Sequence, residues 1–177
     1  MSLSEIRSLT SLARSTVEEY VTNNNVISFD SINFDDYKEK QAGVFVSIHT
    51  KGNLRGCIGT ISPTQKNIIV ETVLNAISAA TRDPRFYPIK KDELADLNYS
   101  VSLLMPPEAI ESEEQLNPNE YGVIVVSGNK RGLLLPGLEG IDTINKQLFH
   151  AKAKAGIKDS DKIELFRFQS IEFKEKE

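Results

Sequence analysis

The chain has 177 residues, 40% of them hydrophobic and 26% charged, a balance typical of a folded globular domain and unlike that of a disordered chain. A formal net charge of -4 gives no general attraction to nucleic acid or anionic membranes, so any contact with phosphate needs a local basic cluster. The single cysteine excludes an internal disulfide framework and indicates a reducing, cytoplasmic compartment, and nothing near the N-terminus resembles a signal peptide.

The first predicted element is an amphipathic helix. Apolar residues recur at helical spacing from Leu3 to Val21, and Ser2 with Glu5 is suited to form a capping box at the start. The asparagines at 23–25 end this helix. The polar connection over residues 22–42 has no pattern that defines its structure.

A β-hairpin follows this connection. Residues 43–49 are mostly β-branched or aromatic, residues 51–53 supply a turn, and residues 54–61 return as the second strand. Gly56 and Gly59 within the return strand indicate a β-bulge or a close approach of another backbone. We therefore expect the return strand to be irregular.

The clearest helix start in the sequence comes next. Ser62 is a favourable N-cap, Pro63 fits the first helical position, and Gln65 completes a capping box. The helix ends near Thr81, because Pro84 disfavours helical geometry in the residue before it. Its predicted core-facing residues are Ile69, Val73, Ala76, Ile77 and Ala80.

The second half of the chain also alternates between strands and helices. Hairpins interspersed with a few helices predict an α+β protein, with a largely antiparallel sheet and helices packed on one side. The predicted elements are a strand over 99–104, a hairpin of 122–127 and 132–135 through Gly128 and Asn129, a helix from an Asp142 cap to a left-handed Gly156 cap, and a closing strand over 163–173.

The return strand of the first hairpin carries the strongest chemical candidate. In an extended strand Arg55 and Cys57 project from the same face, about 7 Å apart. A nearby guanidinium favours the thiolate, the reactive form of cysteine, and Gly56 and Gly59 leave backbone N–H groups open to a ligand. The sequence thus predicts an anion-binding pocket with Cys57 as a candidate nucleophile. The alternative is that Cys57 is a small buried apolar side chain.

A second cluster follows the predicted helix. Arg82, Asp83 and Arg85 stand in a turn with Pro84, and planar guanidinium groups bind carboxylates or phosphates through paired hydrogen bonds. The structural alternative is that Arg82 complements the helix dipole and Asp83 pairs with a neighbouring arginine. Asn75 lies on the helical face that leads to this cluster, which makes it a candidate for the wall of a cleft.

Other kinds of chemistry have little support in the sequence. His49 and His150 lack metal-ligand spacing, so we predict neither a metal site nor a cofactor. The sequence contains no Walker-type phosphate loop, dinucleotide fingerprint or nucleophile-elbow serine. Lys152, Lys154 and Lys158 form a modest basic patch that is better explained as a solvated helix face than as an RNA site.

Several blocks of the sequence match the pattern of a known family. The most specific is the run Leu-Arg-Gly-Cys-Ile-Gly-Thr over residues 54–60. The others are residues 75–80 followed by Arg-Asp-Pro-Arg-Phe at 82–86, residues 99–104 followed by Pro-Pro-Glu at 106–108, residues 122–124 and residues 154–157. Together they resemble the AMMECR domain family, which is named after a candidate gene in the AMME chromosomal region.

This resemblance has implications for architecture and partners. It implies a single domain over residues 1–177 made of two unequal lobes with a cleft between them. The smaller lobe would lie around residues 43–84, embedded in the larger one. The resemblance also implies an association with Memo-type and radical-SAM proteins, a suggested link to RNA modification, and no settled activity.

Three functions stay open on this basis. The first is an enzyme, or an enzyme subunit, that acts on a small anionic substrate in the cleft. The candidate residues of this enzyme are Cys57 as nucleophile and Arg55, Gly56, Gly59, Asn75, Arg82, Asp83 and Arg85 as ligand-binding groups.

The second function is a non-catalytic binding or adaptor module for a Memo-type or radical-SAM partner. The third is an RNA-modification-associated factor, which the acidic balance of the chain disfavours.

Overall fold

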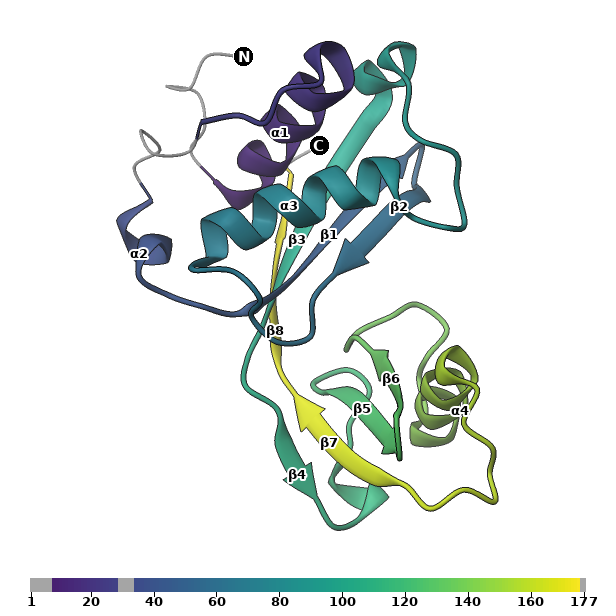
Figure 1. The fold of residues 1–177 in the computed structure, drawn as a ribbon. Coiled ribbons are helices and arrows are strands. Elements are labelled where there is room, and N and C mark those ends of the chain that lie inside the picture. The colour runs from purple at the N-terminus through teal and green to yellow at the C-terminus, as the bar shows by residue number, and fades with distance from the viewer. Residues whose placement is uncertain (1–7, 29–33, 176–177) are drawn as a thin grey trace. The chain divides into compact units, whose positions relative to one another are not determined.

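The chain folds into two compact units, each built around one four-stranded sheet (Figure 1). The structure, a computed structural model, describes residues 8–28 and 34–175. Unit 1 comprises Met1–Leu103 and Ile171–Glu177, and unit 2 comprises Leu104–Ser170. Helices combined with antiparallel strand pairs confirm the predicted α+β class, with two sheets where one was expected.

In unit 1 the helices α1 and α3 pack against one face of a sheet whose strand order is β2-β1-β3-β8 (Figure 1). Val44, Val46 and Ile48 of β1 are fully buried in the core beneath these helices, and the residues between them are only half-buried. The elements of this unit are α1 (Leu9–Asn23), α2 (Asp35–Lys38), β1 (Gly43–Thr50), β2 (Asn53–Gly59), α3 (Ile68–Thr81), the 3-10 helix η2 (Lys91–Asp96), β3 (Leu97–Leu104) and β8 (Ser170–Lys174).

Unit 2 has the strand order β4-β7-β5-β6, and all neighbouring strands are antiparallel. Its helix α4 approaches β6 so closely that a Cβ atom on Gly132 would lie 1.9 Å from the carbonyl oxygen of Ala151. Only glycine fits there. The elements are β4 (Glu108–Ile110), the 3-10 helix η3 (Glu113–Gln115), β5 (Gly122–Ser127), β6 (Lys130–Leu134), α4 (Ile144–Ala155) and β7 (Glu164–Phe168).

The ends of α1 follow from local capping. Ser8 is the N-cap and its side chain accepts a hydrogen bond from the first turn, so the helix begins at Leu9. Asn24 takes a left-handed conformation with φ of 55° at the C-cap, and the predicted end within the asparagine run is confirmed. The predicted cap formed by Ser2 and Glu5 lies outside the described residues.

The predicted start of α3 is wrong, and its predicted end is confirmed. The helix begins at Ile68 with Asn67 as the N-cap, and it ends at Thr81. The proposed cap by Ser62 and Gln65 does not form, because these residues belong to the loop that precedes the helix. All five residues expected to face the core are buried.

A buried carboxylate explains this later start. Glu71 is only 2% exposed, and it accepts hydrogen bonds at 2.7–2.8 Å from the hydroxyls of Thr60 and Thr64 and from the backbone N–H groups of Thr64 and Gln65. Burial alone would raise the pKa of Glu71, but these hydrogen bonds together hold it below its ordinary value. The loop is therefore fastened to the first turn of α3 and does not join the helix.

The start of α4 also differs from the prediction. Thr143 is the N-cap, whereas Asp142 forms an ion pair with Lys146 at 2.7 Å. The N-cap is the residue whose side chain accepts a hydrogen bond from the free N–H groups of the first turn. Asp and Thr are both favourable N-cap residues, so the sequence alone does not decide between two such neighbours. The predicted left-handed cap at Gly156, with φ of 62°, is confirmed.

The closing strand predicted over residues 163–173 is in fact two strands. β7 and β8 belong to different sheets and are separated by Gln169, whose carbonyl accepts the Met105 N–H at 2.8 Å. Alternation of side chains defines a strand but not its partner, so a strand that changes sheets looks continuous in the sequence.

We predict that Glu71→Gln lowers the free energy of unfolding by about 2–3 kcal/mol at neutral pH, because an amide cannot replace a buried carboxylate that accepts four hydrogen bonds. Urea titrations of the variant and the natural chain measure this difference. Glu39→Gln is the control, since Glu39 is exposed in the same unit.

The pH dependence of this penalty has a definite sign. The pKa of Glu71 is lowered on folding, so its contribution to stability is present above the ordinary value of 4.5 and is lost as the pH falls through the folded value. The difference in unfolding free energy between the natural chain and the Glu71→Gln variant should therefore become smaller below pH 4.5. A difference that stays constant down to strongly acidic pH would show that the charge of Glu71 does not cause it.

Candidate functional site

The hairpin of β1 and β2 places Ser47 opposite Cys57. The Ser47 hydroxyl donates a hydrogen bond to the Cys57 sulfur, with Oγ and Sγ 3.2 Å apart. Cys57 is half-buried, so the sulfur is neither packed away in the core nor fully open to water. The turn alone could not have identified Ser47 from the sequence, because the pairing that starts at Thr50 and Asn53 shifts by one residue at a β-bulge before it reaches Cys57.

A β-bulge moves Arg55 away from the position that the sequence suggested. The pairing passes from Ile48 and Gly56 directly to His49 and Leu54, which leaves Arg55 without a partner in the register. Simple alternation beyond a bulge no longer predicts where a side chain lies. The expectation that Arg55 would be the guanidinium beside the thiol therefore loses its geometric basis.

Arg55 instead binds the segment that follows the 82–86 turn. Its Nε and Nη2 donate to the two carboxylate oxygens of Glu93 at 2.7 and 3.0 Å, and its Nη1 donates to the Tyr87 carbonyl at 3.0 Å. Hydrogen bonding by the Arg55 side chain is the main cause of the lowered pKa of Glu93. No sequence pattern pointed to Glu93 as the partner of Arg55, because the two residues lie 38 positions apart.

Asp83 connects the turn to the outer edge of β2. Its side chain is 2% exposed, and Oδ2 accepts the backbone N–H of Cys57 at 2.8 Å. Arg85 donates to the same carboxylate from its backbone N–H and its Nε at 3.0 Å and from Nη2 at 2.7 Å. Hydrogen bonding by Arg85 is the largest cause that lowers the pKa of Asp83 to about 2; burial opposes it, and the Cys57 N–H adds to it.

Arg85 is the arginine that the structure places beside Cys57. Its Nη2 donates to the Cys57 carbonyl at 3.3 Å, and its side chain is 52% exposed. Asp83 is the largest cause of the raised pKa of Arg85, and Cys57 makes a smaller contribution of the same sign. The guanidinium that contacts Cys57 is therefore that of Arg85, whereas Arg55 is bound by Glu93 and the Tyr87 carbonyl.

Phe86 lies next to both cations. The guanidinium carbons of Arg55 and Arg85 lie 5.9 and 5.5 Å from the centre of its ring, which is within the range of cation–π attraction. The ring is half-buried and so adds apolar contact area to both arginines.

The remaining predicted site residues have structural positions in unit 1. Asn75 is 6% exposed and its Nδ2 donates to the Val44 carbonyl at 2.9 Å, so it fastens α3 to β1. A Cβ atom on Gly56 would lie 2.3 Å from the Ala79 carbonyl oxygen, and one on Gly59 would enter the Phe45 ring.

Arg82 is exposed and is the C-cap residue of α3. Its side chain has no ion pair within the described parts of the chain. Whether it and the other predicted residues bind a ligand stays a prediction.

In residues 8–28 and 34–175, no group of three or more His, Cys, Asp and Glu side chains is placed to hold a metal ion. No helix in those same ranges is long and apolar enough to cross a membrane.

These observations define a class of α+β proteins in which a buried aspartate joins a cysteine-bearing edge strand to an arginine-rich turn. The AMMECR1 family model matches residues 10–173, and the chain belongs to this family. It is 48% identical over 160 residues to a protein of Thermotoga maritima, a match that covers 89% of this chain and 92% of that one.

A protein of Clostridium acetobutylicum is 44% identical over 165 residues, covering 93% of this chain but only 35% of its own length. The crystal structure of an uncharacterized protein from Pyrococcus horikoshii superposes with a TM-score of 0.87 at 31% identity and covers 95% of this chain and 90% of that one.

We predict that Asp83→Asn lowers the stability of the folded chain by about 2 kcal/mol at neutral pH, because the native pKa lies near 2 and the ordinary value is 3.8. Since the folded pKa is the lower one, this contribution is present above pH 3.8 and is lost as the pH falls toward 2.

The same substitution should speed the amide hydrogen exchange of Cys57 more than that of other β2 amides, because Asp83 is the acceptor of this N–H. Asp92→Asn, which alters an exposed carboxylate, is the control. Unchanged exchange at Cys57 in the Asp83 variant would contradict the edge contact.

Proposed function

We propose that the chain is an enzyme, or an enzyme subunit, that attacks a small anionic substrate with the thiol of Cys57. The observation that carries this proposal is the pairing of the Cys57 sulfur with the Ser47 hydroxyl at 3.2 Å, beside the half-exposed guanidinium of Arg85. The reactive form of a cysteine is the negatively charged thiolate, and a hydroxyl donor and a guanidinium are the kinds of group that commonly stand beside a reactive cysteine.

The choice of an anionic substrate rests on Arg85. Its Nε and Nη2 are occupied by Asp83 and the Cys57 carbonyl, but its Nη1 has no hydrogen-bond partner in the described part of the chain. Two N–H groups on the exposed side of a guanidinium suit a carboxylate or phosphate oxygen. An anion held there would lie close to the sulfur that is to attack the same molecule.

A non-catalytic binding module is the second candidate, and a specific observation favours it. No His, Asp or Glu side chain hydrogen-bonds the Cys57 sulfur within the described residues, whereas a cysteine nucleophile commonly has a base beside it. In that case the chain would act as an adaptor for a Memo-type or radical-SAM protein. A complex with such a partner that survives Cys57→Ala would favour the adaptor.

The test compares two alkylating reagents on the only thiol of the chain. We expect the rate ratio of iodoacetate to iodoacetamide, measured by intact mass at neutral pH, to be about fivefold higher in the folded chain than in urea, because the Nη1 N–H groups of Arg85 can donate hydrogen bonds to the carboxylate of the anionic reagent. Arg85→Gln should remove this preference while the fold persists. Arg131→Gln, at an exposed position of unit 2, is the matched control.

Two results would contradict the catalytic proposal. The first is a thiol that reacts with neither reagent until the chain unfolds, since the role of Cys57 would then be limited to packing. The second is a rate ratio that is equal in folded and unfolded protein, since the site would then have no affinity for an anionic electrophile.

A further inference from the structure

The most exposed large apolar side chain among the described residues is that of Tyr87, with 89% of its surface open to water. It belongs to the loop between α3 and η2, over residues 82–90. Single exposed apolar residues are common on protein surfaces and need no special cause. Tyr87 differs from such residues in how firmly its backbone is held and in the charges around it.

The backbone on both sides of Tyr87 is anchored to the core of unit 1. Arg55 donates to the Tyr87 carbonyl at 3.0 Å, the Phe86 N–H donates to the Asp83 carbonyl at 3.1 Å, and the Ile89 N–H donates to the Ala80 carbonyl at 2.8 Å. Ile89 is itself only 5% exposed. The loop is therefore ordered in advance, so little conformational entropy remains to be lost when a partner covers the ring.

The unpaired charges in the segment of Tyr87 are more positive than negative although the chain as a whole is acidic. Asp83 is neutralised by Arg85, and Glu93 is neutralised by Arg55. Over residues 82–96 the remaining cations are Arg82, Lys90 and Lys91, and the remaining acids are Asp92 and Asp96. All five are exposed and form no ion pair within the described residues.

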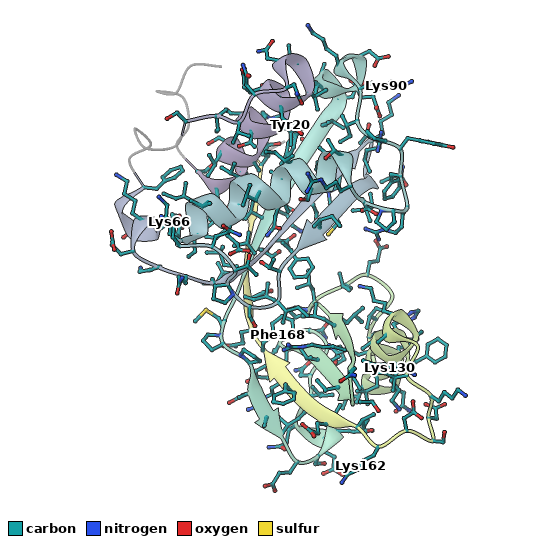
Figure 2. The ribbon with its side chains drawn as sticks, in the orientation of Figure 1. Tyr20, Lys66, Lys90, Lys130, Lys162 and Phe168 are labelled. Carbon is teal, nitrogen blue, oxygen red and sulfur yellow. The ribbon has the colours of Figure 1, made fainter. Side chains whose placement is uncertain are left out.

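Figure 2 shows Lys90 on the outer rim of unit 1. Along the chain, the exposed Tyr87 thus lies between the unpaired cation Arg82 and the unpaired cations Lys90 and Lys91, in a protein with a net charge of -4.

We propose that Tyr87 and the cations Arg82, Lys90 and Lys91 form a docking surface for an acidic segment of another protein. Tyrosine and arginine are the residue types most enriched where binding energy is concentrated, and a rigid tyrosine inserts into an apolar pocket while its hydroxyl stays in water. The surrounding cations attract a partner of opposite charge and exclude a basic one. This surface is independent of the thiol chemistry proposed above.

Single-stranded RNA is the competing occupant, because an aromatic ring flanked by cations also stacks with a base. The charge of the whole chain disfavours it, since a polyanion longer than the patch meets the acidic remainder of the molecule. A short acidic peptide covers the patch alone and avoids that repulsion.

The test selects peptides from a random dodecapeptide phage library on the immobilised full chain, with counter-selection on the Tyr87→Ala variant. We expect the recovered peptides to be more acidic than the starting library. A labelled synthetic copy of a recovered peptide should lose about tenfold or more of its affinity with Tyr87→Ala, as for a tyrosine at the centre of an interface. Fluorescence anisotropy gives these affinities.

Further variants separate this proposal from the alternatives. The double variant Lys90→Glu and Lys91→Glu should weaken the peptide at low salt, whereas Phe149→Ala, which removes a ring that is 66% exposed in unit 2, should leave the affinity unchanged. Cys57→Ala should also leave it unchanged, so a failure here is distinct from a failure of the catalytic proposal.

Three outcomes overturn the docking proposal. Recovered peptides could be no more acidic than the library, or Tyr87→Ala could bind them as tightly as the natural chain does. The third is an oligouridylate that binds more tightly than the peptides and competes with them, which would assign the surface to RNA.

Discussion

The carboxylate of Asp83 is the constraint on which the site depends. β2 is an edge strand, and the backbone N–H and C=O of Cys57 point outward from the sheet, where a neighbouring strand would otherwise bind them. Asp83 accepts that N–H and Arg85 donates to that C=O, so two side chains take the place of a strand. One ion pair thereby positions the backbone of Cys57, brings Arg85 to its carbonyl, and protects the edge from pairing with another chain.

The two buried carboxylates among the described residues of unit 1 are stabilised in different ways. Asp83 has a guanidinium partner, whereas Glu71 is held by hydroxyl and backbone donors with no cation among them. Both solutions lower the pKa, because hydrogen bonds to the charged form outweigh the cost of burial. Both also connect β2, or the loop that follows it, to the two ends of α3. The C-terminal half of the strand that carries Cys57 is thus connected to both ends of α3, which holds that part of the strand in place.

Local patterns in the sequence predicted the fold well and the contacts of the site poorly. Alternation identified both hairpins, Pro84 gave the end of α3, and Gly156 gave the end of α4. The partners of the site residues could not be predicted in this way. Glu93 lies 38 positions from Arg55, and a carboxylate 26 positions away binds the N–H of Cys57. The bulge at Arg55 also cancels the alternation from which its direction was inferred.

Arg55 and Arg85 have different contacts, and this difference determines what kind of ligand the site could hold. Arg55 is saturated by Glu93 and the Tyr87 carbonyl, so it supports the loop that presents Tyr87. Arg85 is half-exposed and its Nη1 has no hydrogen-bond partner among the described residues, but Asp83 already neutralises its charge. An incoming anion would therefore meet a neutral pair with two directed N–H donors rather than a bare cation. Such a site would select a ligand by geometry more than by charge.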